Sequence, residues 1–293
     1  MIIVNLMGGL GNQMFQYAAG RSLSLRHQTA LKLDLSFLEG DQTGNTPRTF
    51  ELDRFNISAQ KASPREVSQM SGRQLPVRDR LRNRFFKAGI KGTLFREKQF
   101  NVHPEFFLLP DNVYLDGYWQ SESYFLEYNE ILREEFTLKT PLSGRCLGLA
   151  DEIQSVNAVS MHIRRGDYVS DPITRAAHHV CDLDYYRRAE EEISKSVRAP
   201  HFFVFSDDPD WVAANLKLRY PTRFVSHNQG MAHKDLRLMS LCRHHILANS
   251  SFSWWGAWLN PRPDKIVCSP GKWFNEWQAD TSDLIPDAWL RIE

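Results

Sequence analysis

Short apolar runs alternate with longer helical patterns through the second half of the chain. The segments between the apolar runs are three or four turns long and mostly begin at Ser or Asp, which is typical of helices. Strands that alternate with helices of this length indicate βαβ units and a parallel sheet, with ligand contacts at the carboxyl ends of the strands. The predicted strands are 158–163, 201–206, 222–227, 245–249 and 265–269.

The first half begins with the same pattern and then loses regularity. Its predicted elements are a strand at 2–7, a turn at 8–12, a helix at 13–28, a strand at 30–35, and a strand that runs into a turn and helix within 112–125. Residues 139–148 (KTPLSGRCLG) have the Pro, Gly and Ser content of a linker. We therefore expect an α/β protein of two domains, 1–145 and 146–293, with the final helix as a candidate for return to the first domain.

Composition narrows the class of protein. The 293 residues are 42% hydrophobic and 24% charged, and 36 basic residues nearly balance 35 acidic ones, so bulk charge does not favour a nucleic-acid partner. No segment approaches the roughly 20 apolar residues that span a bilayer, and the N-terminus lacks the basic region of a secretory signal. We expect a cytoplasmic protein, at most peripheral to the inner membrane.

The cysteines and acidic motifs do not predict a metal site. Cys146, Cys181, Cys242 and Cys268 are widely spaced, which is typical of reduced, mostly buried thiols. DLD at 182–184 and DPD at 208–210 match a D-x-D pattern, but both fall where helix caps are expected. We assign no metal to either motif.

A basic stretch lies within residues 73–98. It has nine basic residues against two acidic ones, with apolar residues between them. A basic amphipathic helix of this kind could contact an anionic membrane or an anionic acceptor. The favoured interpretation is a solvated helix face with its apolar side in the core.

The sequence HIRRGDY follows the strand at 158–163. Arg164 and Arg165 face opposite ways if the strand continues, so one guanidinium could hold a pyrophosphate while the other pairs with acids. His162, Gly166 and Asp167 are close to the pair in the chain, and glycine would let the backbone approach a ligand. The alternative is that both arginines belong to a salt-bridge network.

Two other predicted strands end in polar groups. Asp207 and Asp208 follow the strand at 201–206; either could accept hydrogen bonds from the N1–H and N2–H₂ edge of guanine, or begin a helix. The strand at 245–249 runs into a helix start that could bind phosphate, or simply cap the helix. The polar residues there are Asn249, Ser250, Ser251 and Ser253.

GGLGN is not a dinucleotide fingerprint, because Met14 stands where the motif requires glycine or alanine. The turn still allows close approach of a ligand, with Asn12 and Gln13 as neutral hydrogen-bonding groups. Motifs of serine hydrolases, zinc proteases and P-loop enzymes are absent.

Five stretches together resemble bacterial α-1,2-fucosyltransferases, glycosyltransferase family 11. They are GGLGNQMFQYAAGRSL, LDGYWQSESYF, HIRRGDYV, FFVFSDDPDW and DLRLMSLCRHHILANSSFSWWGAWL, in the order of the family. The resemblance implies a GT-B arrangement, in which two Rossmann-like domains face a cleft and the donor site lies in the C-terminal parallel sheet. It implies inverting transfer from GDP-L-fucose to the 2-hydroxyl of a terminal β-galactoside, with no obligatory metal or other cofactor.

The resemblance also implies roles for individual residues. Related fucosyltransferases use the first Arg of H-x-R-R on the pyrophosphate, which is Arg164 here. By the same comparison His162 and Asp207 or Asp208 lie near guanine, and Asn12 lies at the reaction centre. The residues near the phosphates are Ser250, Ser251, Phe252 and Ser253.

The chemistry requires a group that takes the proton of the acceptor hydroxyl. Asp167 is the candidate, since it is the only carboxylate in HIRRGDY; alternatively it orients Arg165 or caps a turn, and Asn12 positions the hydroxyl. Aromatic faces stack on sugar rings, so acceptor contacts are expected from the first domain. The candidates are Asn12, Gln13, Tyr118, Trp119 and Gln120. Of Trp254, Trp255 and Trp258, at least two are expected in the core.

Two other functions remain open. One is a GT-B transferase with another GDP-sugar, such as GDP-mannose; the other is a catalytically silent glycan-binding protein of the same fold. The expected acceptor is a galactose-terminated oligosaccharide or surface polysaccharide such as an O-antigen repeat, carried on a lipid at the inner membrane.

Overall fold

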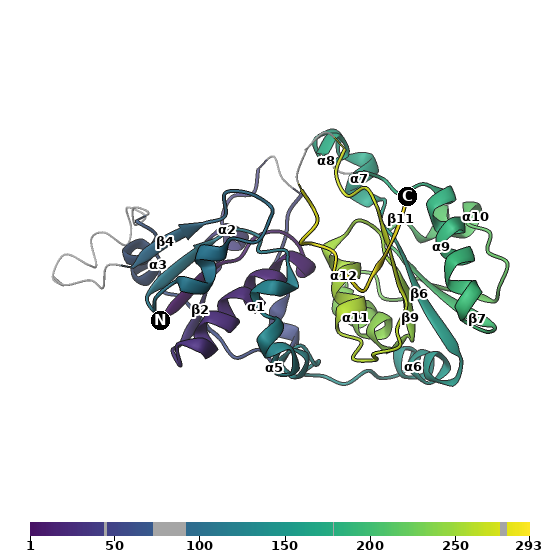
Figure 1. Ribbon diagram of the computed structural model, residues 1–293, viewed down its shortest axis with the longest axis horizontal. Coiled ribbons are helices and arrows are strands. Elements are labelled where there is room, and N and C mark those ends of the chain that lie inside the picture. Colours follow the sequence, from purple (N-terminus) through teal and green to yellow (C-terminus); the bar gives the residue numbers. More distant parts are fainter. Residues whose placement is uncertain (44–45, 73–91, 178, 276–279) are drawn as a thin grey trace. The chain divides into compact units, whose positions relative to one another are not determined.

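The computed structural model describes residues 1–43, 46–72, 92–177, 179–275 and 280–293, and this part of the chain divides into two compact units (Figure 1). Unit 1 comprises Met1–Thr137 and Ser282–Leu284, and unit 2 comprises Leu138–Thr281 and Ile285–Glu293. The chain leaves unit 1 just before the linker composition at 139–148. Most of the basic stretch, residues 73–91, lies outside the described residues.

Unit 1 is built on a five-stranded parallel sheet in the order β3-β2-β1-β5-β4. Its strands are β1 (Ile2–Asn5), β2 (Leu31–Asp34), β3 (Gln60–Lys61), β4 (Thr93–Arg96) and β5 (Val113–Asp116). Its helices are α1 (Leu10–Arg26), α2 (Ser36–Glu39), α3 (Pro64–Ser71) and α5 (Asn129–Glu135), with 3₁₀ turns η1 (Leu52–Arg54), η2 (Pro104–Leu108), η3 (Glu122–Tyr124) and η4 (Leu126–Tyr128). The apolar pattern did not predict β3 and β4, because these edge strands are short and have no fully buried residue.

Unit 2 has a six-stranded parallel sheet in the order β11-β10-β9-β6-β7-β8. Its strands are β6 (Asn157–Ile163), β7 (Pro200–Ser206), β8 (Thr222–Val225), β9 (His244–Ile246), β10 (Val267–Pro270) and β11 (Leu290–Ile292). Its helices are α6 (Arg145–Ser155), α7 (Gly166–Ser170), α8 (Pro172–Ala177), α9 (Leu183–Ser196), α10 (Pro209–Asn215), α11 (Ala232–Leu241) and α12 (Ser251–Trp258). In chain order this sheet is 3-2-1-4-5-6, the order of a Rossmann-type nucleotide-binding unit.

All five strands predicted for the second half are present, and the α/β class of two Rossmann-like units is confirmed. The end of the chain differs from expectation. Where a final helix was predicted, the last element is β11, which pairs with β10. β11 has no fully buried residue, so the apolar pattern of the sequence does not predict it.

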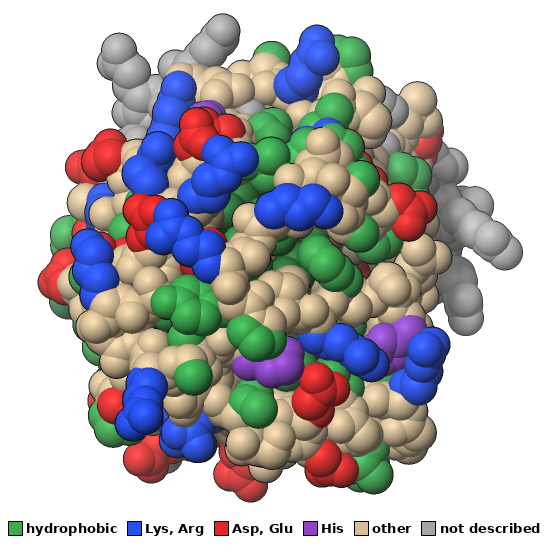
Figure 2. Space-filling view, turned by 90° about the vertical axis from the view of Figure 1, so that its right-hand side faces the viewer, with side chains coloured by type: hydrophobic (Ala, Val, Ile, Leu, Met, Phe, Trp, Pro, Cys, Tyr) green, Lys and Arg blue, Asp and Glu red, His purple; other side chains and the backbone are tan. Residues whose placement is uncertain are grey.

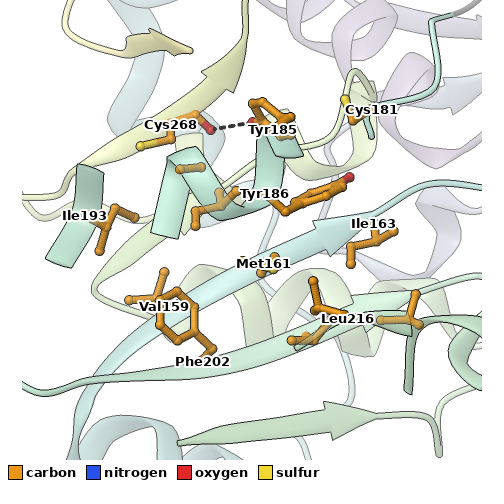
Figure 3. Packing of buried hydrophobic residues seen from close by; sticks show 14 of the residues in the cluster. Val159, Met161, Ile163, Cys181, Tyr185, Tyr186, Ile193, Phe202, Leu216 and Cys268 are labelled. Carbon is orange, nitrogen blue, oxygen red and sulfur yellow. Dashed lines mark hydrogen bonds between the residues drawn. The ribbon is translucent and has the colours of Figure 1, made fainter. Parts of the chain in front are cut away.

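Alternation along β6 divides the core of unit 2 into two layers. Val159, Met161 and Ile163 pack with Tyr185 and Tyr186 of α9 on one face, together with residues of α10 (Figure 3). Ala158 lies on the opposite face, in a cluster with residues of α6 and α11. His162 has the same strand parity as Ala158, so it points to this second face, where α12 also packs.

Each sheet has a topological switch point, where two neighbouring strands are connected to strands on opposite sides of the pair. In unit 2 it lies between β6 and β9, and in unit 1 between β1 and β5. Ligands of open parallel sheets bind outside the carboxyl ends of the strands at such points. The segments to inspect are therefore 164–167 and 247–253 in unit 2, and 6–12 and 117–120 in unit 1.

Other predictions concern burial and surface. All four cysteines are free and buried, and all three of the tryptophans expected mainly in the core are at most 2% exposed. On the face shown in Figure 2, basic and acidic side chains are interspersed. Within the described residues, none of the helices combines the length and apolar character needed to span a bilayer.

Candidate functional site

Arg164 lies at the carboxyl end of β6, between two carboxylates. Its Nη2 donates to Asp167 Oδ1 at 2.6 Å, and its Nη1 lies 2.8 Å from Asp207 Oδ2. The guanidinium also lies 5.3 Å from the ring centre of Tyr168. Burial opposes its charge, but Asp207 and Asp167 outweigh this effect and raise the pKa of Arg164. The side chain is 22% exposed and two of its five N–H donors are used, so it can still donate to an anion.

Arg165 has a separate set of partners, as strand alternation predicts. Its Nε lies 3.2 Å from Asp208 Oδ2, and its guanidinium stacks 3.4 Å from the ring centre of Trp211. Asp208 also caps α10 by accepting from the backbone N–H of Trp211. Both arginines therefore belong to an ion-pair network, which was the alternative interpretation of the sequence. Arg165 has a local packing role, and Arg164 is the candidate for a ligand.

Gly166 leaves room for the carboxylate of Asp207. A Cβ on this glycine would overlap with Asp207 Oδ2, which holds Arg164. The other carboxylate oxygen, Oδ1, accepts from the backbone N–H of Arg165 at 2.9 Å. The structure thus gives Gly166 a role that the sequence did not indicate, close approach of one carboxylate; close approach of a ligand stays a prediction.

His162 is buried beside the start of α12. Its ring lies 5.4 Å from that of Phe252, it is 4% exposed, and its buried Nδ1 has no hydrogen-bond partner among the described residues. Burial, with a smaller effect of the Arg164 charge, lowers the pKa of His162 to about 3, so the imidazole is neutral at working pH. The neutral ring is a hydrogen-bonding and packing group here and does not supply positive charge.

The polar residues before and within α12 divide into two groups. Asn249 holds the backbone, since its Nδ2 donates to the carbonyls of His179 and Trp273, and Ser253 donates to Ala248 and Ser250. Both are buried, so neither presents its side chain to a ligand as predicted. The partly exposed positions at the helix start are Ser251 and Phe252, and the hydroxyl of the largely buried Ser250 caps the N–H of Phe252.

Asp235 is a candidate for binding the base of the donor, and it was not predicted from the sequence. It lies in the first turn of α11, where an acid is ordinarily attributed to the helix dipole, so the sequence carried no distinctive signal. Asn228 donates to its Oδ1 at 2.7 Å, and Asn228 in turn accepts from the thiol of Cys146. Burial raises the pKa of Asp235 to about 6, although the bond from Asn228 opposes this shift. It therefore differs from Asp207 and Asp208, whose oxygens bind arginines.

In unit 1 the switch point brings together Asn12 and Gln120, which are 108 positions apart. Gln120 Nε2 donates to Asn12 Oδ1 at 2.8 Å. Gln13 is fully buried, and its amide bonds the backbone at Gly8, Thr49 and Glu51. Gln13 therefore stabilises the loop around α1 and is not available as the acceptor contact that the sequence suggested.

The two aromatic candidates of unit 1 differ in burial. Trp119 is fully buried and stacks on Phe95, with ring centres 5.7 Å apart, so its predicted role as a sugar platform is wrong. Tyr118 is 41% exposed and retains that possibility. Period-two alternation predicts opposite directions for neighbouring residues, but which one faces the core depends on the turn.

In the described part of the chain, no three His, Cys, Asp or Glu side chains form a group that could hold a metal ion.

Comparison with known proteins gives extensive matches. The family model "Glycosyl transferase family 11" matches residues 52–292. Alpha-1,2-colitosyltransferase of Escherichia coli is 35% identical over 305 residues, covering 100% of this chain and 99% of that protein. O-antigen biosynthesis glycosyltransferase WbnK of Escherichia coli is 34% identical over 309 residues, covering 98% and 99%. Galactoside alpha-(1,2)-fucosyltransferase 1 of Rattus norvegicus is 30% identical over 196 residues, covering 59% and 52%.

Among solved structures, NodZ alpha-1,6-fucosyltransferase soaked with GDP-fucose matches at a TM-score of 0.49 and 16% identity, covering 91% of this chain and 94% of that one. The full-length relatives and the family model define the class: the protein is a glycosyltransferase. Within that class, the chain belongs to Glycosyl transferase family 11.

Proposed function

We propose that the protein transfers L-fucose, with inversion, from GDP-L-fucose to the 2-hydroxyl of a terminal β-galactoside. The observation that carries the donor assignment is the placement of Arg164, a partly exposed guanidinium with unused donors, at the switch point of a Rossmann-type sheet. Names of relatives support an α-1,2 linkage and an O-antigen or other surface-polysaccharide acceptor. A lipid carrier for that acceptor would place the reaction at the inner face of a membrane.

The donor half of the mechanism follows from charge. The bond from the sugar C1 to the β-phosphate breaks through an oxocarbenium-like state, and negative charge grows on GDP. Arg164 would meet this charge with its remaining N–H groups, beside the N-terminus of α12, where backbone N–H groups favour an anion. Asp167 and Asp207 hold the guanidinium in place before the donor arrives. The proposal needs no metal ion, because these groups stabilise the leaving GDP themselves.

For guanine, Asp235 replaces Asp207 and Asp208 in our proposal. Both oxygens of Asp207 and of Asp208 already accept from arginines or backbone N–H groups. Among the described residues Asn228 alone donates to Asp235, and burial raises the pKa of this carboxyl, so its negative charge has little compensation. A carboxylate in that state gains most from the paired N1–H and N2–H₂ donors of guanine.

Proton removal from the acceptor stays with Asp167, and Asn12 positions the hydroxyl in this proposal. Asp167 already accepts from Arg164 at 2.6 Å, so it has a second task, the orientation of the pyrophosphate-binding guanidinium. A weak base is sufficient when C1 is already cationic as the proton leaves. In unit 1, Gln120 fixes the amide of Asn12 through their hydrogen bond.

A second donor has specific support. One full-length relative is named a colitosyltransferase. L-Colitose is the 3-deoxy form of L-fucose, so the two GDP-sugars differ by one hydroxyl and share every group that Arg164 and Asp235 would bind. The nucleotide site described above does not distinguish them.

The deciding experiment is a transfer assay with GDP-L-fucose, GDP-L-colitose and GDP-mannose, each with lactose, with and without EDTA. We expect α-1,2-linked fucosyl-lactose, found by mass spectrometry and linkage analysis and undiminished by EDTA. Faster transfer from GDP-L-colitose would make that sugar nucleotide the donor in place of GDP-L-fucose. Transfer from none of the three donors would contradict the proposed reaction.

The same samples test the donor site by GDP titration. Arg164→Ala should weaken GDP binding roughly 10–100-fold, the effect of losing charge-assisted hydrogen bonds, while the protein stays folded. Arg187→Ala is the matched control, since Arg187 is an exposed arginine of unit 2 that pairs with Asp184 on the surface of α9. Equal GDP affinity in the Arg164 variant and the wild type would exclude the pyrophosphate role.

A further inference from the structure

The carboxylate of Glu97 holds a turn at the switch point of unit 1. Glu97 follows β4 directly, and the turn 117–120 follows β5, its neighbour in the sheet. Oε2 of Glu97 accepts from the backbone N–H of Tyr118 at 2.7 Å, and Oε1 accepts from that of Trp119 at 3.0 Å. One side chain thus satisfies two consecutive peptide donors.

The conformation of the turn requires such support. Trp119 has φ of 57°, in the left-handed region that is costly for a bulky residue. Gly117 allows the close approach, because a Cβ there would overlap with Cβ of Glu97. Burial raises the pKa of Glu97, while the two backbone hydrogen bonds lower it. The hydrogen bonds therefore offset part of the cost of burying the charged carboxylate.

The turn sends three consecutive side chains in three directions. Trp119 goes into the core, where it packs with Phe95 and Tyr124. Tyr118 remains 41% exposed, and Gln120 reaches Asn12. The left-handed conformation of Trp119 makes this possible. In a regular strand, Tyr118 and Gln120 would lie on the same face.

We propose that Glu97 is a positioning residue for the glycan acceptor: it holds the 117–120 turn so that Tyr118 and the Gln120–Asn12 pair present a fixed sugar-binding surface. The inference rests on the proposed function, because it takes Tyr118, Gln120 and Asn12 as acceptor contacts. It adds a residue that carries no expected role in the sequence and that acts through the backbone. The ligand it selects is a neutral sugar, recognised by an aromatic face and two amides.

The test is Glu97→Gln, which keeps the shape and replaces one acceptor oxygen by an NH₂ group facing a peptide N–H. We expect the acceptor KM for lactose to rise roughly tenfold, the effect of losing about one charged hydrogen bond, with GDP affinity unchanged. Glu66→Gln is the matched control, because Glu66 also accepts a backbone N–H in unit 1, from Ser63, but lies in the capping box of α3. Its acceptor KM should equal that of the wild type.

A double-mutant cycle separates positioning from general destabilisation. In the Tyr118→Ala background, Glu97→Gln should raise KM by much less than tenfold, because the platform it positions is already gone. An equal effect in both backgrounds, or an unchanged KM in Glu97→Gln, would overturn the proposal. If Glu97→Gln yields little folded protein, Gly117→Ala perturbs the same contact from the other side and should raise KM in the same way.

Lactose binding measured in parallel by saturation-transfer NMR keeps the two proposals distinguishable. A wild type that binds lactose but transfers no fucose contradicts the proposed donor, and the Glu97 variants are then compared by lactose affinity. A wild type that does not bind lactose contradicts the galactoside acceptor and the role of Glu97 together.

Discussion

At the scale of single residues, surroundings assign different tasks to chemically identical carboxylates. The oxygens of Asp207 and Asp208 accept from arginines and backbone N–H groups. Asp235 accepts from the neutral amide of Asn228, and burial raises its pKa. In the sequence, the first two lie in a conspicuous motif and Asp235 lies in a helix turn. The partners seen in the structure make Asp235 the stronger candidate for binding guanine.

The pKa of Asp235 gives GDP binding a specific pH dependence. The group binds guanine as a carboxylate, and it is protonated below about pH 6, so affinity should fall as the pH decreases through that value. In Asp235→Asn, GDP should bind roughly 10–100-fold more weakly at pH 7.5. Calorimetric titration between pH 5.5 and 7.5 measures both effects.

The terminal phosphate of GDP titrates in the same pH range. The Asp235→Asn variant measures how much of the pH dependence of GDP affinity comes from this phosphate. The wild-type curve should be steeper than that of the variant. Parallel curves would mean that Asp235 does not contact the base.

At the scale of elements, the β6–α7 junction is built around the contact between Gly166 and Asp207. The glycine begins α7, and its missing Cβ leaves room for the carboxylate that holds Arg164. The junction therefore positions the guanidinium before any ligand is present.

Gly166→Ala should displace Asp207 and destabilise the protein by about 1–3 kcal/mol, the usual cost of overpacking. GDP affinity should fall as well, because Arg164 loses one of its two partners. Thermal unfolding and GDP titration measure the two effects.

Gly148→Ala is the matched control for this substitution. Gly148 lies within α6, where a Cβ meets no atom within 4 Å, so the change should stabilise the protein by about 0.5–1 kcal/mol. The prediction for Gly166 is wrong if both variants behave alike.

At the scale of the whole molecule, each unit has its own parallel sheet and its own buried polar groups. In unit 2, His162 and His245 are buried as neutral rings, and burial lowers both pKa values. His245 forms hydrogen bonds with Ser160 and Asn260, whereas Nδ1 of His162 has no hydrogen-bond partner in the described part of the chain. Unfolding exposes both rings to water, where they can take up protons, so stability depends on pH.

Acidification from pH 7 to pH 5 should therefore destabilise the protein. The folded pKa of His162 is about 3 and the unfolded value is near 6.5, so its contribution is lost as the pH falls through 6.5. The loss for this residue is about 2 kcal/mol over that range. Denaturant unfolding at the two pH values should show a smaller change in His162→Asn than in the wild type, and an equal change would contradict the shifted pKa.

The sequence by itself determined the α/β class, five of the six strands of the sheet of unit 2 and the burial of the tryptophans in α12. Each of these depends on local hydrophobic periodicity, which a single segment carries. The same pattern located HIRRGDY at a strand end, where Arg164 is found. β3, β4 and β11 were missed because each is short and has no fully buried residue. The predicted final helix was wrong, since the last element is β11.

Only the tertiary structure decided what the polar side chains at those strand ends contact. The bonds between Asn12 and Gln120 and between Arg164 and Asp207 join segments far apart in the chain, and the packing of Trp119 depends on a left-handed backbone turn held by Glu97. Hydrophobic patterning records which face of an element is buried. It does not record which donor meets which acceptor, because that depends on strand order and on turns whose geometry other segments impose.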